Sequence, residues 1–252
     1  MRSIQPARLS ARQRRRNGFV EQIRARFTVG ADGARSTVAR RLGLDVNRRL
    51  IIGVEEVFPV SASAVPAFHC VIDPRLAPGY LAWLVDDGRN AHVGLAGRPA
   101  GLTAPLPRLL RTFLERFPGV PTPIGPAHRR GGPIPVGGVL RRIVNADGLL
   151  VGDAAGAVSP LTAGGLDPCL RMAQLAAGVT YDYLRTGDAG VLRHYDGSAF
   201  RARFRLRLLL RDVFSQLRTP ATAEAAFWLL RTPLGRAAAA RVLFGSGSFP
   251  PQ

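Results

Sequence analysis

Residues 148–167 read Gly-Leu-Leu-Val-Gly-Asp-Ala-Ala-Gly-Ala-Val-Ser-Pro-Leu-Thr-Ala-Gly-Gly-Leu-Asp, and this stretch decides the fold. It opens with a short apolar run, 149–151, which is typical of a buried strand. Gly152 ends that strand, Asp153 follows at once, and small residues with Pro160 form a loop. The stretch therefore predicts a strand that crosses over into a helix.

The helix is predicted to begin after Gly164-Gly165 and to end at Thr186-Gly187. Apolar residues recur along it at helical spacing and are expected to share one face. These residues are Leu166, Leu170, Ala173, Ala177, Tyr181 and Leu184.

The strand end and the helix start together offer a site for a polar ligand. A carboxylate such as that of Asp153 accepts hydrogen bonds from hydroxyl groups, and a helix start presents unpaired N–H groups and the positive end of the helix dipole. The glycines let a ligand approach the backbone closely. An ordinary crossover with a tight turn is the alternative. We favour the site, because Gly, Asp, Pro and Gly-Gly coincide within one connection.

A second stretch of interest lies upstream. Residues 24–29 form a short alternating run that leads into Gly30-Ala31-Asp32-Gly33-Ala34-Arg35-Ser36-Thr37-Val38. Ser36 can cap a short helix that runs through Leu42 and stops at Gly43. Taken alone, this stretch is either a ligand loop or an Asp-Gly turn before a capped helix.

Taken together and in this order, the two stretches resemble the motifs of the flavoprotein monooxygenase and geranylgeranyl reductase superfamily. Residues 152–165 resemble its second FAD-binding motif, and residues 30–38 resemble its Asp-Gly motif. The resemblance implies an α/β (α+β) fold. It would contain an incomplete FAD/NAD(P)-binding Rossmann-like domain, an antiparallel substrate-domain sheet and C-terminal helices.

The resemblance also implies where FAD would bind. Asp153 would bind the ribityl chain, Asp32 would approach the pyrophosphate and ribose, and Arg35 or Arg40 would balance phosphate charge. The helix start at Leu166 would lie beside the pyrimidine end of the flavin, where the dipole stabilises negative charge on the reduced ring. The expected cofactor-binding residues are Gly30, Asp32, Gly33, Arg35, Ser36, Arg40, Gly152, Asp153, Ala154, Pro160, Gly164, Gly165 and Leu166.

Residues 50–100 read as strands of an antiparallel sheet, with a hairpin turn at 86–90. Tyr80 and Trp83 resemble an aromatic element in the substrate-domain strands of geranylgeranyl reductases, which implies that they bind substrate. Strand alternation puts them on opposite faces, so at most one would face a pocket. Packing within a half-buried sheet is the alternative for each.

Four further helices are predicted, at 106–117, 191–217, 222–230 and 233–244. Between the first two, residues 131–138 resemble a segment that precedes the second flavin motif in the reductases, and their glycines imply close backbone approach to the flavin or to the sheet. The predicted division of the chain is an irregular basic segment (1–24), a partial FAD-binding domain (25–48 and 139–188), a substrate-binding sheet domain (49–138) and a C-terminal helical region (189–252).

Composition limits the classes of partner. The chain has 252 residues and a formal net charge of +18, but all 35 basic residues are arginine, which is typical of biased base composition and argues against nucleic acid. No apolar run is long enough for a transmembrane helix, so we expect a cytoplasmic protein. The arginines at 201–207 form either a solvated face or a contact with anionic lipid, which is compatible with peripheral membrane association. Cys70 and Cys169 read as idle thiols, and no metal site is expected.

The sequence contains no Gly-x-Gly-x-x-Gly, the fingerprint that receives the pyrophosphate in folds of this kind. The pyrophosphate-binding half of the site is therefore expected outside this chain. An apolar sheet edge would then be exposed where the absent strands would pair, which predicts self-association.

The expected function is that of an FAD-dependent oxidoreductase that reduces carbon–carbon double bonds of an isoprenoid-like apolar substrate, with NAD(P)H as electron donor. One alternative is a flavin-dependent monooxygenase of an aromatic or polyketide substrate. The other is a cofactor-free remnant or basic interaction module. No side chain is assigned as an acid or base, because much of the chemistry belongs to the cofactor.

Overall fold

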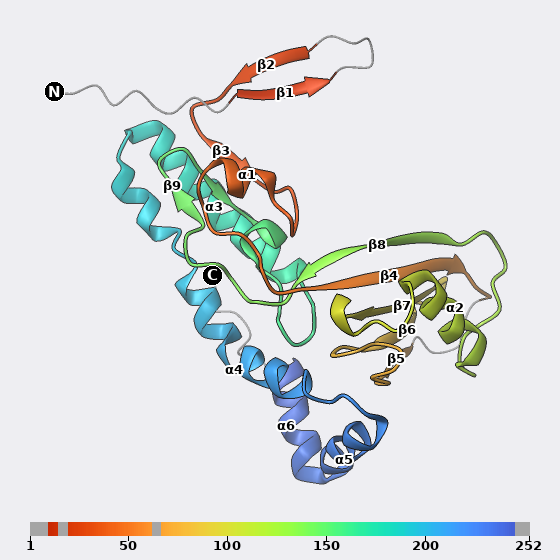
Figure 1. Ribbon diagram of the computed structural model, residues 1–252. Helices are drawn as coiled ribbons and strands as arrows, with labels where there is room; N and C mark the ends of the chain where they lie inside the picture. Colours follow the sequence, from red (N-terminus) through yellow and green to blue (C-terminus); the bar gives the residue numbers. More distant parts are fainter. Residues whose placement is uncertain (1–9, 15–19, 62–66, 245–252) are drawn as a thin grey trace. The chain divides into compact units, whose positions relative to one another are not determined.

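The computed structural model describes residues 10–14, 20–61 and 67–244 (Figure 1). The chain divides into two units, each with its own packing: unit 1 comprises 1–49 and 135–205, and unit 2 comprises 50–134 and 206–252. The mixed class predicted from the sequence, with an antiparallel sheet and C-terminal helices, is confirmed.

The elements of unit 1 are β1 (Ser10–Arg14), β2 (Val20–Arg24), β3 (Thr28–Gly30), α1 (Thr37–Arg41), β9 (Val144–Asn145), β10 (Gly148–Leu150), the 3₁₀ turn η2 (Gly152–Ala155), α3 (Leu166–Thr186) and the 3₁₀ turn η3 (Ala189–His194). Those of unit 2 are β4 (Leu50–Pro59), β5 (Ala67–Val71), β6 (Ala82–Asp86), β7 (Asn90–Gly97), the 3₁₀ turn η1 (Pro99–Gly101), α2 (Leu106–Arg116), β8 (His128–Pro135), α5 (Pro220–Arg231) and α6 (Pro233–Phe244). Helix α4 (Ser198–Phe214) runs across the boundary.

Unit 1 contains a three-stranded sheet in the order β3-β10-β9. Strands β3 and β10 run parallel, with Leu150 opposite Gly30. Leu149 and Leu150 are fully buried, which explains why this short apolar run forms a strand. Because parallel strands end at the same sheet edge, the loops that follow β3 and β10 leave the sheet together.

The N-terminal segment differs from its prediction. Residues 10–14 and 20–24 form the antiparallel pair β1–β2, with Ala11 opposite Ile23, rather than irregular chain. The sequence carries Asn17-Gly18 between these two runs, and such a dipeptide between two extended runs favours a hairpin. Asn17 and Gly18 themselves lie outside the described residues.

Helix α3 has the predicted length, but the predicted core face is wrong. Leu166, Leu170 and Tyr181 are 85%, 70% and 67% exposed. The buried side chains are those of Pro168, Met172, Ala176 and Val179 on the opposite side of the helix. The helix carries two apolar stripes, and its own sequence pattern does not show which one packs on the sheet.

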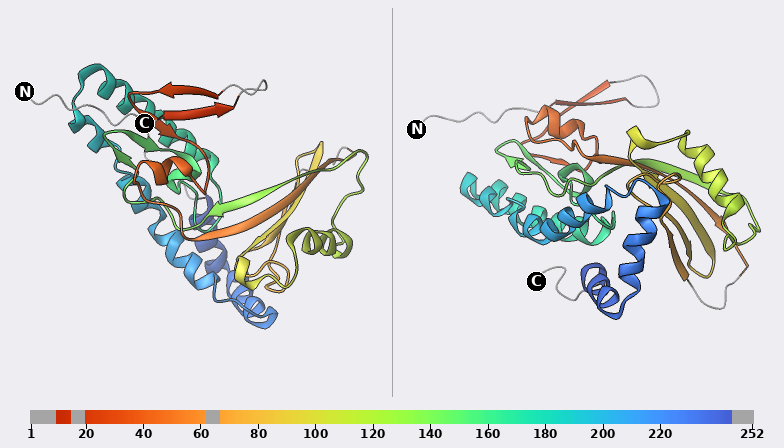
Figure 2. Two further views of the ribbon diagram at one scale, coloured as in Figure 1. Left: turned by 45° about the horizontal axis from the view of Figure 1, so that its top comes forward. Right: turned by 60° about the horizontal axis from the view of Figure 1, so that its bottom comes forward.

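Unit 2 contains a five-stranded sheet in the order β5-β6-β7-β4-β8, and α2 covers one face of it (Figures 1 and 2). The core between them joins buried residues of β4, β6 and β7 to Leu109, Leu110 and Phe113 of α2. Alternation along β4 sends Val54 and Phe58 into this core and Glu55 to the opposite face, which we call the open face.

The C-terminal helices follow the prediction in part. Helix α6 has the predicted bounds, and α5 extends the predicted helix slightly at both ends. The single helix predicted for 191–217 is interrupted, because Gly197 adopts a left-handed backbone (φ +72°) between η3 and α4. None of the helices in the described part of the chain is long and apolar enough to span a membrane.

Candidate functional site

The two loops predicted to bind a ligand meet at one edge of the unit 1 sheet. The Val151 N–H donates to the Gly30 carbonyl at 2.9 Å, so the β3–β10 pairing continues up to the first residues of both loops. The Asp-Gly loop leaves β3, and the Gly152-Asp153 turn leaves β10 directly beside it.

Asn47 bridges these two loops and was not identified from the sequence. Its side-chain amide donates to the Ala34 carbonyl at 3.1 Å and to the Asp153 carbonyl at 2.8 Å. Gly156, with φ +74°, leaves room for this amide, since a Cβ there would lie 2.9 Å from Asn47 Oδ1. No motif surrounds Asn47 in the sequence, so only the fold shows that it contacts Asp153, 106 positions away.

Asp32 and Ser36 form the start of helix α1. The Ser36 hydroxyl donates to Asp32 Oδ1 at 2.5 Å and accepts from the Ala39 N–H at 2.8 Å. The Thr37 and Val38 N–H groups donate to Asp32 Oδ2. Burial by itself would raise the pKa of Asp32, but these hydrogen bonds outweigh it and hold the pKa below its usual value.

Asp153 has the opposite environment. Its side chain is half-buried, and its carboxylate accepts no hydrogen bond from any residue in the described ranges. Burial raises its pKa. The carboxylate lies beside the start of α3, because a Cβ on Gly165 would be 3.6 Å from Asp153 Oδ1. A half-buried acceptor without a donor, next to a helix start, fits a ligand that brings hydroxyl groups.

The other predicted cofactor residues fall into two groups. Ala154, Pro160, Gly30 and Gly152 are buried and shape the backbone, and Gly30 and Gly152 leave no room for a Cβ against Val38 and Cys169. Arg35, Arg40, Gly164 and Leu166 are exposed, and Gly33 and Gly165 are partly exposed. Arg40 donates to the Thr37 hydroxyl at 3.1 Å.

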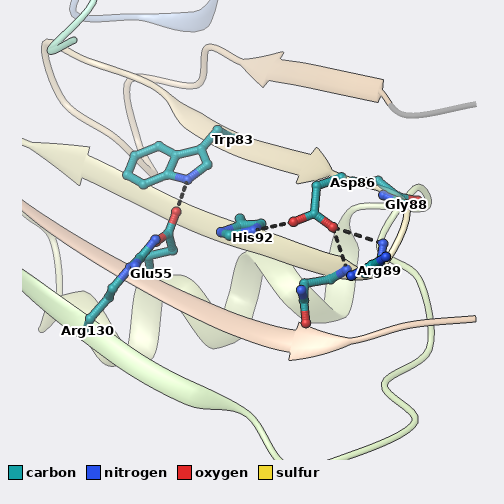
Figure 3. A network of polar contacts seen from close by, with 9 residues as sticks. Glu55, Trp83, Asp86, Gly88, Arg89, His92 and Arg130 are labelled. Carbon is teal, nitrogen blue, oxygen red and sulfur yellow. Dashed lines mark hydrogen bonds and ion pairs between the residues drawn. The ribbon is translucent and has the colours of Figure 1, made fainter. Parts of the chain in front are cut away.

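Trp83 lies on the open face of the unit 2 sheet. Its indole extends across Gly94, where a Cβ would collide with the ring, and its Nε1–H donates to Glu55 Oε1 at 2.9 Å. Arg130 donates to the other oxygen of Glu55 at 2.6 Å (Figure 3). These side chains therefore form a row across the sheet, from β6 over β7 and β4 to β8. Each carboxylate oxygen of Glu55 accepts one of the two hydrogen bonds.

Tyr80 is placed differently from its prediction. It precedes β6, so strand alternation does not decide its direction. It packs, partly buried, against the Arg211 guanidinium of α4, whose centre lies 5.3 Å from the ring centroid, and burial raises the pKa of its hydroxyl. Of the two aromatic residues, the open face carries Trp83.

The described residues contain no group of three or more His, Cys, Asp and Glu side chains that could hold a metal ion. Cys70 and Cys169 are both free thiols.

Comparison with known proteins gives three findings. Residues 6–80 match the family model described as "FAD binding domain". A digeranylgeranylglycerophospholipid reductase of Methanothrix thermoacetophila is 34% identical over 185 residues, which is 70% of this chain and 46% of that protein. The crystal structure of a geranylgeranyl bacteriochlorophyll reductase-like protein from Thermoplasma acidophilum aligns with a TM-score of 0.74 at 20% identity, over 91% of this chain and 62% of that one.

A flavin-dependent halogenase, CmlS, also shares the fold, with a TM-score of 0.66 at 15% identity over 98% of this chain and 50% of that one. The chain spans about half the length of the curated reductases that it matches, from 43% to 53%. The match to the FAD binding domain includes the Asp-Gly loop and ends before the Gly152-Asp153 turn.

Proposed function

We propose that this chain, which belongs to the geranylgeranyl reductase-like family of FAD-dependent oxidoreductases, binds FAD and acts in the reduction of carbon–carbon double bonds of an isoprenoid-like apolar substrate. The reductase names of its relatives and the FAD binding domain support the proposal. The observation that carries it is the half-buried Asp153 carboxylate, which lacks a donor in the described structure and lies beside the start of α3.

In this proposal each loop has one task. Asp153 accepts hydrogen bonds from the ribityl hydroxyls, and the start of α3 presents N–H groups and a positive dipole to the flavin ring. Asn47 holds the two loops at a fixed separation. A reduced flavin bound there would supply the hydride for the double bond, and we propose NAD(P)H as the source of its electrons.

The substrate is proposed to lie on the open face of the unit 2 sheet, against Trp83. Glu55 fixes the indole from one side, and Arg130 fixes Glu55. An indole held flat over Gly94 offers an apolar surface for a polyprenyl chain. An isoprenoid-like substrate is itself a membrane component, so we extend the proposal to peripheral contact with a membrane.

Titration with three flavins tests the cofactor site. Asp153→Ala should weaken FAD and riboflavin by about 1.5–3 kcal/mol, or roughly 10- to 150-fold in Kd. Lumiflavin, which lacks the ribityl chain, should bind wild type and variant alike. Asp182→Ala removes an equal charge from α3, far from its start, where the carboxylate lies 3.8 Å from Arg185, and serves as the matched control.

Equal FAD affinity of wild type and Asp153→Ala would remove Asp153 from the site, and a protein that stays colourless with added FAD would support the cofactor-free alternative. The shared fold of the halogenase favours oxygen-dependent flavin chemistry as the second candidate function. Aerobic NAD(P)H oxidation stimulated by an aromatic substrate, with product oxygenation, would select that candidate over the reductase.

A further inference from the structure

The turn between helices α5 and α6 exposes an unusual set of side chains. Trp228 and Leu229 at the end of α5 are 70% and 62% exposed, and Leu234 at the start of α6 is 82% exposed. Arg231 and Arg236 are exposed among them. We call these five residues the α5–α6 corner.

The corner is held by its own hydrogen bonds. The Thr232 hydroxyl donates to the Leu229 carbonyl at 2.8 Å and accepts from the Gly235 N–H at 3.0 Å. The Arg236 N–H donates to the Thr232 carbonyl at 2.9 Å, so α6 begins directly after Thr232. A Cβ on Gly235 would collide with the Leu229 carbonyl oxygen, so the two helices approach closely here, as Figure 1 shows. The apolar side chains therefore stand on a fixed turn.

We propose that the α5–α6 corner docks on the surface of an anionic lipid bilayer. A Trp and two Leu side chains match the interfacial region, where an indole is stable between headgroups and acyl chains. The two arginines flank them and match lipid phosphates in charge. From 219 to 242 the only acidic residue is Glu224, against Arg231, Arg236 and Arg241, so repulsion from anionic lipid is small.

A bilayer fits this surface better than a second copy of the chain. Pairing two corners would bury the same apolar side chains but would bring Arg231 and Arg236 of each copy toward their counterparts, which costs free energy in a dry contact. Lipid headgroups supply the opposite charge instead. The inference rests on the proposed function only for the reason that the protein contacts a membrane. Flavin binding and vesicle binding are measured separately, so either can fail alone.

Tryptophan fluorescence reports docking directly, because the chain has only Trp83 and Trp228. In a Trp83→Phe variant, vesicles of phosphatidylcholine with phosphatidylserine should shift the Trp228 emission to the blue, and brominated lipid should quench it. The reciprocal Trp228→Phe variant should show no shift. Vesicles of phosphatidylcholine alone should bind roughly 25-fold more weakly, at about fivefold for each arginine near the surface.

Substitutions with a matched control localise the contact in flotation assays of the whole chain. Leu234→Asp should reduce vesicle binding at least about tenfold, and Arg231→Gln with Arg236→Gln should remove its salt dependence. Ile124→Asp alters an apolar residue of similar exposure, 63%, elsewhere in unit 2 and should leave binding unchanged. Circular dichroism checks that each variant is folded.

Three outcomes would overturn the proposal. They are no binding of the folded wild type to anionic vesicles, equal binding by folded Leu234→Asp, and a vesicle-independent dimer of the wild type that Leu234→Asp dissociates. The last would assign the corner to a second copy of the chain.

Discussion

At the scale of single residues, Asp32 and Asp153 are two carboxylates at one sheet edge with opposite roles in stability. Asp32 accepts hydrogen bonds from Ser36, Thr37 and Val38, so its ionised form stabilises the fold. Asp153 is half-buried without a donor, so its ionised form destabilises the protein in the absence of a ligand. A ligand that donates hydrogen bonds to this carboxylate would offset the free-energy cost of its burial, so ligand binding should stabilise the fold.

Replacing Asp153 by Asn tests this account through the pH dependence of folding. The folded state binds the Asp153 proton more tightly than the unfolded chain does, so wild type loses stability as pH rises from about 4 through the raised folded-state pKa and loses no more above it. Asn does not ionise. The ligand-free Asp153→Asn protein should therefore have the higher melting temperature at neutral pH, with an advantage that vanishes on acidification below both pKa values. An advantage that is independent of pH would contradict the assignment.

At the scale of elements, the sequence predicts what local chemistry determines. Ser36 caps α1, and Pro233 starts α6 at the predicted residue. Strands β4 to β7 lie within residues 50–100, as predicted, and along β7 the core residues Ala91, Val93 and Leu95 alternate with His92 and Gly94. Glu55 and Glu56 are two adjacent acidic residues in β4, which the local sequence pattern does not explain. A tertiary contact does: Glu55 forms an ion pair with Arg130 of β8, and Glu56 forms one with Arg129. Contacts of this kind, like the Asn47 bridge, join residues that no local pattern relates.

Gly94 of β7 shows how one element positions a side chain of another. Gly94→Ala would place a methyl group inside the Trp83 ring, so the indole must leave Glu55. We expect a loss of about 1–3 kcal/mol in the free energy of unfolding and a red shift of Trp83 emission in a Trp228→Phe background. Gly132→Ala in β8, where no atom lies within 4 Å of the new Cβ, is the control and should change neither quantity. An unshifted Gly94→Ala emission would show that the ring is not held over that residue.

At the scale of the whole molecule, each unit leaves apolar surface uncovered within the described residues. In unit 1, β3 lies at the edge of its sheet with Val29 47% exposed, and α3 presents the stripe of Leu166, Leu170 and Tyr181 to solvent. Parallel sheets are stable when helices cover both faces, and exposed stripes of this size mark surfaces that bind further structure. The sequence predicted an exposed edge but not the exposed helix face, because the choice between the two stripes of α3 depends on packing with distant segments.

These exposed surfaces predict self-association of the isolated chain. Leu170→Gln combined with Tyr181→Gln removes apolar area from the middle of α3 and leaves the buried residues Met172, Ala176 and Val179 in place, so the fold should persist. In analytical ultracentrifugation at increasing protein concentration, this variant should stay monomeric to higher concentration than wild type. Ile124→Gln, at an apolar site of similar exposure in unit 2, should associate as wild type does. If the α3 variant associates unchanged, the contact lies elsewhere, and the unpaired edge of β3 becomes the surface to block.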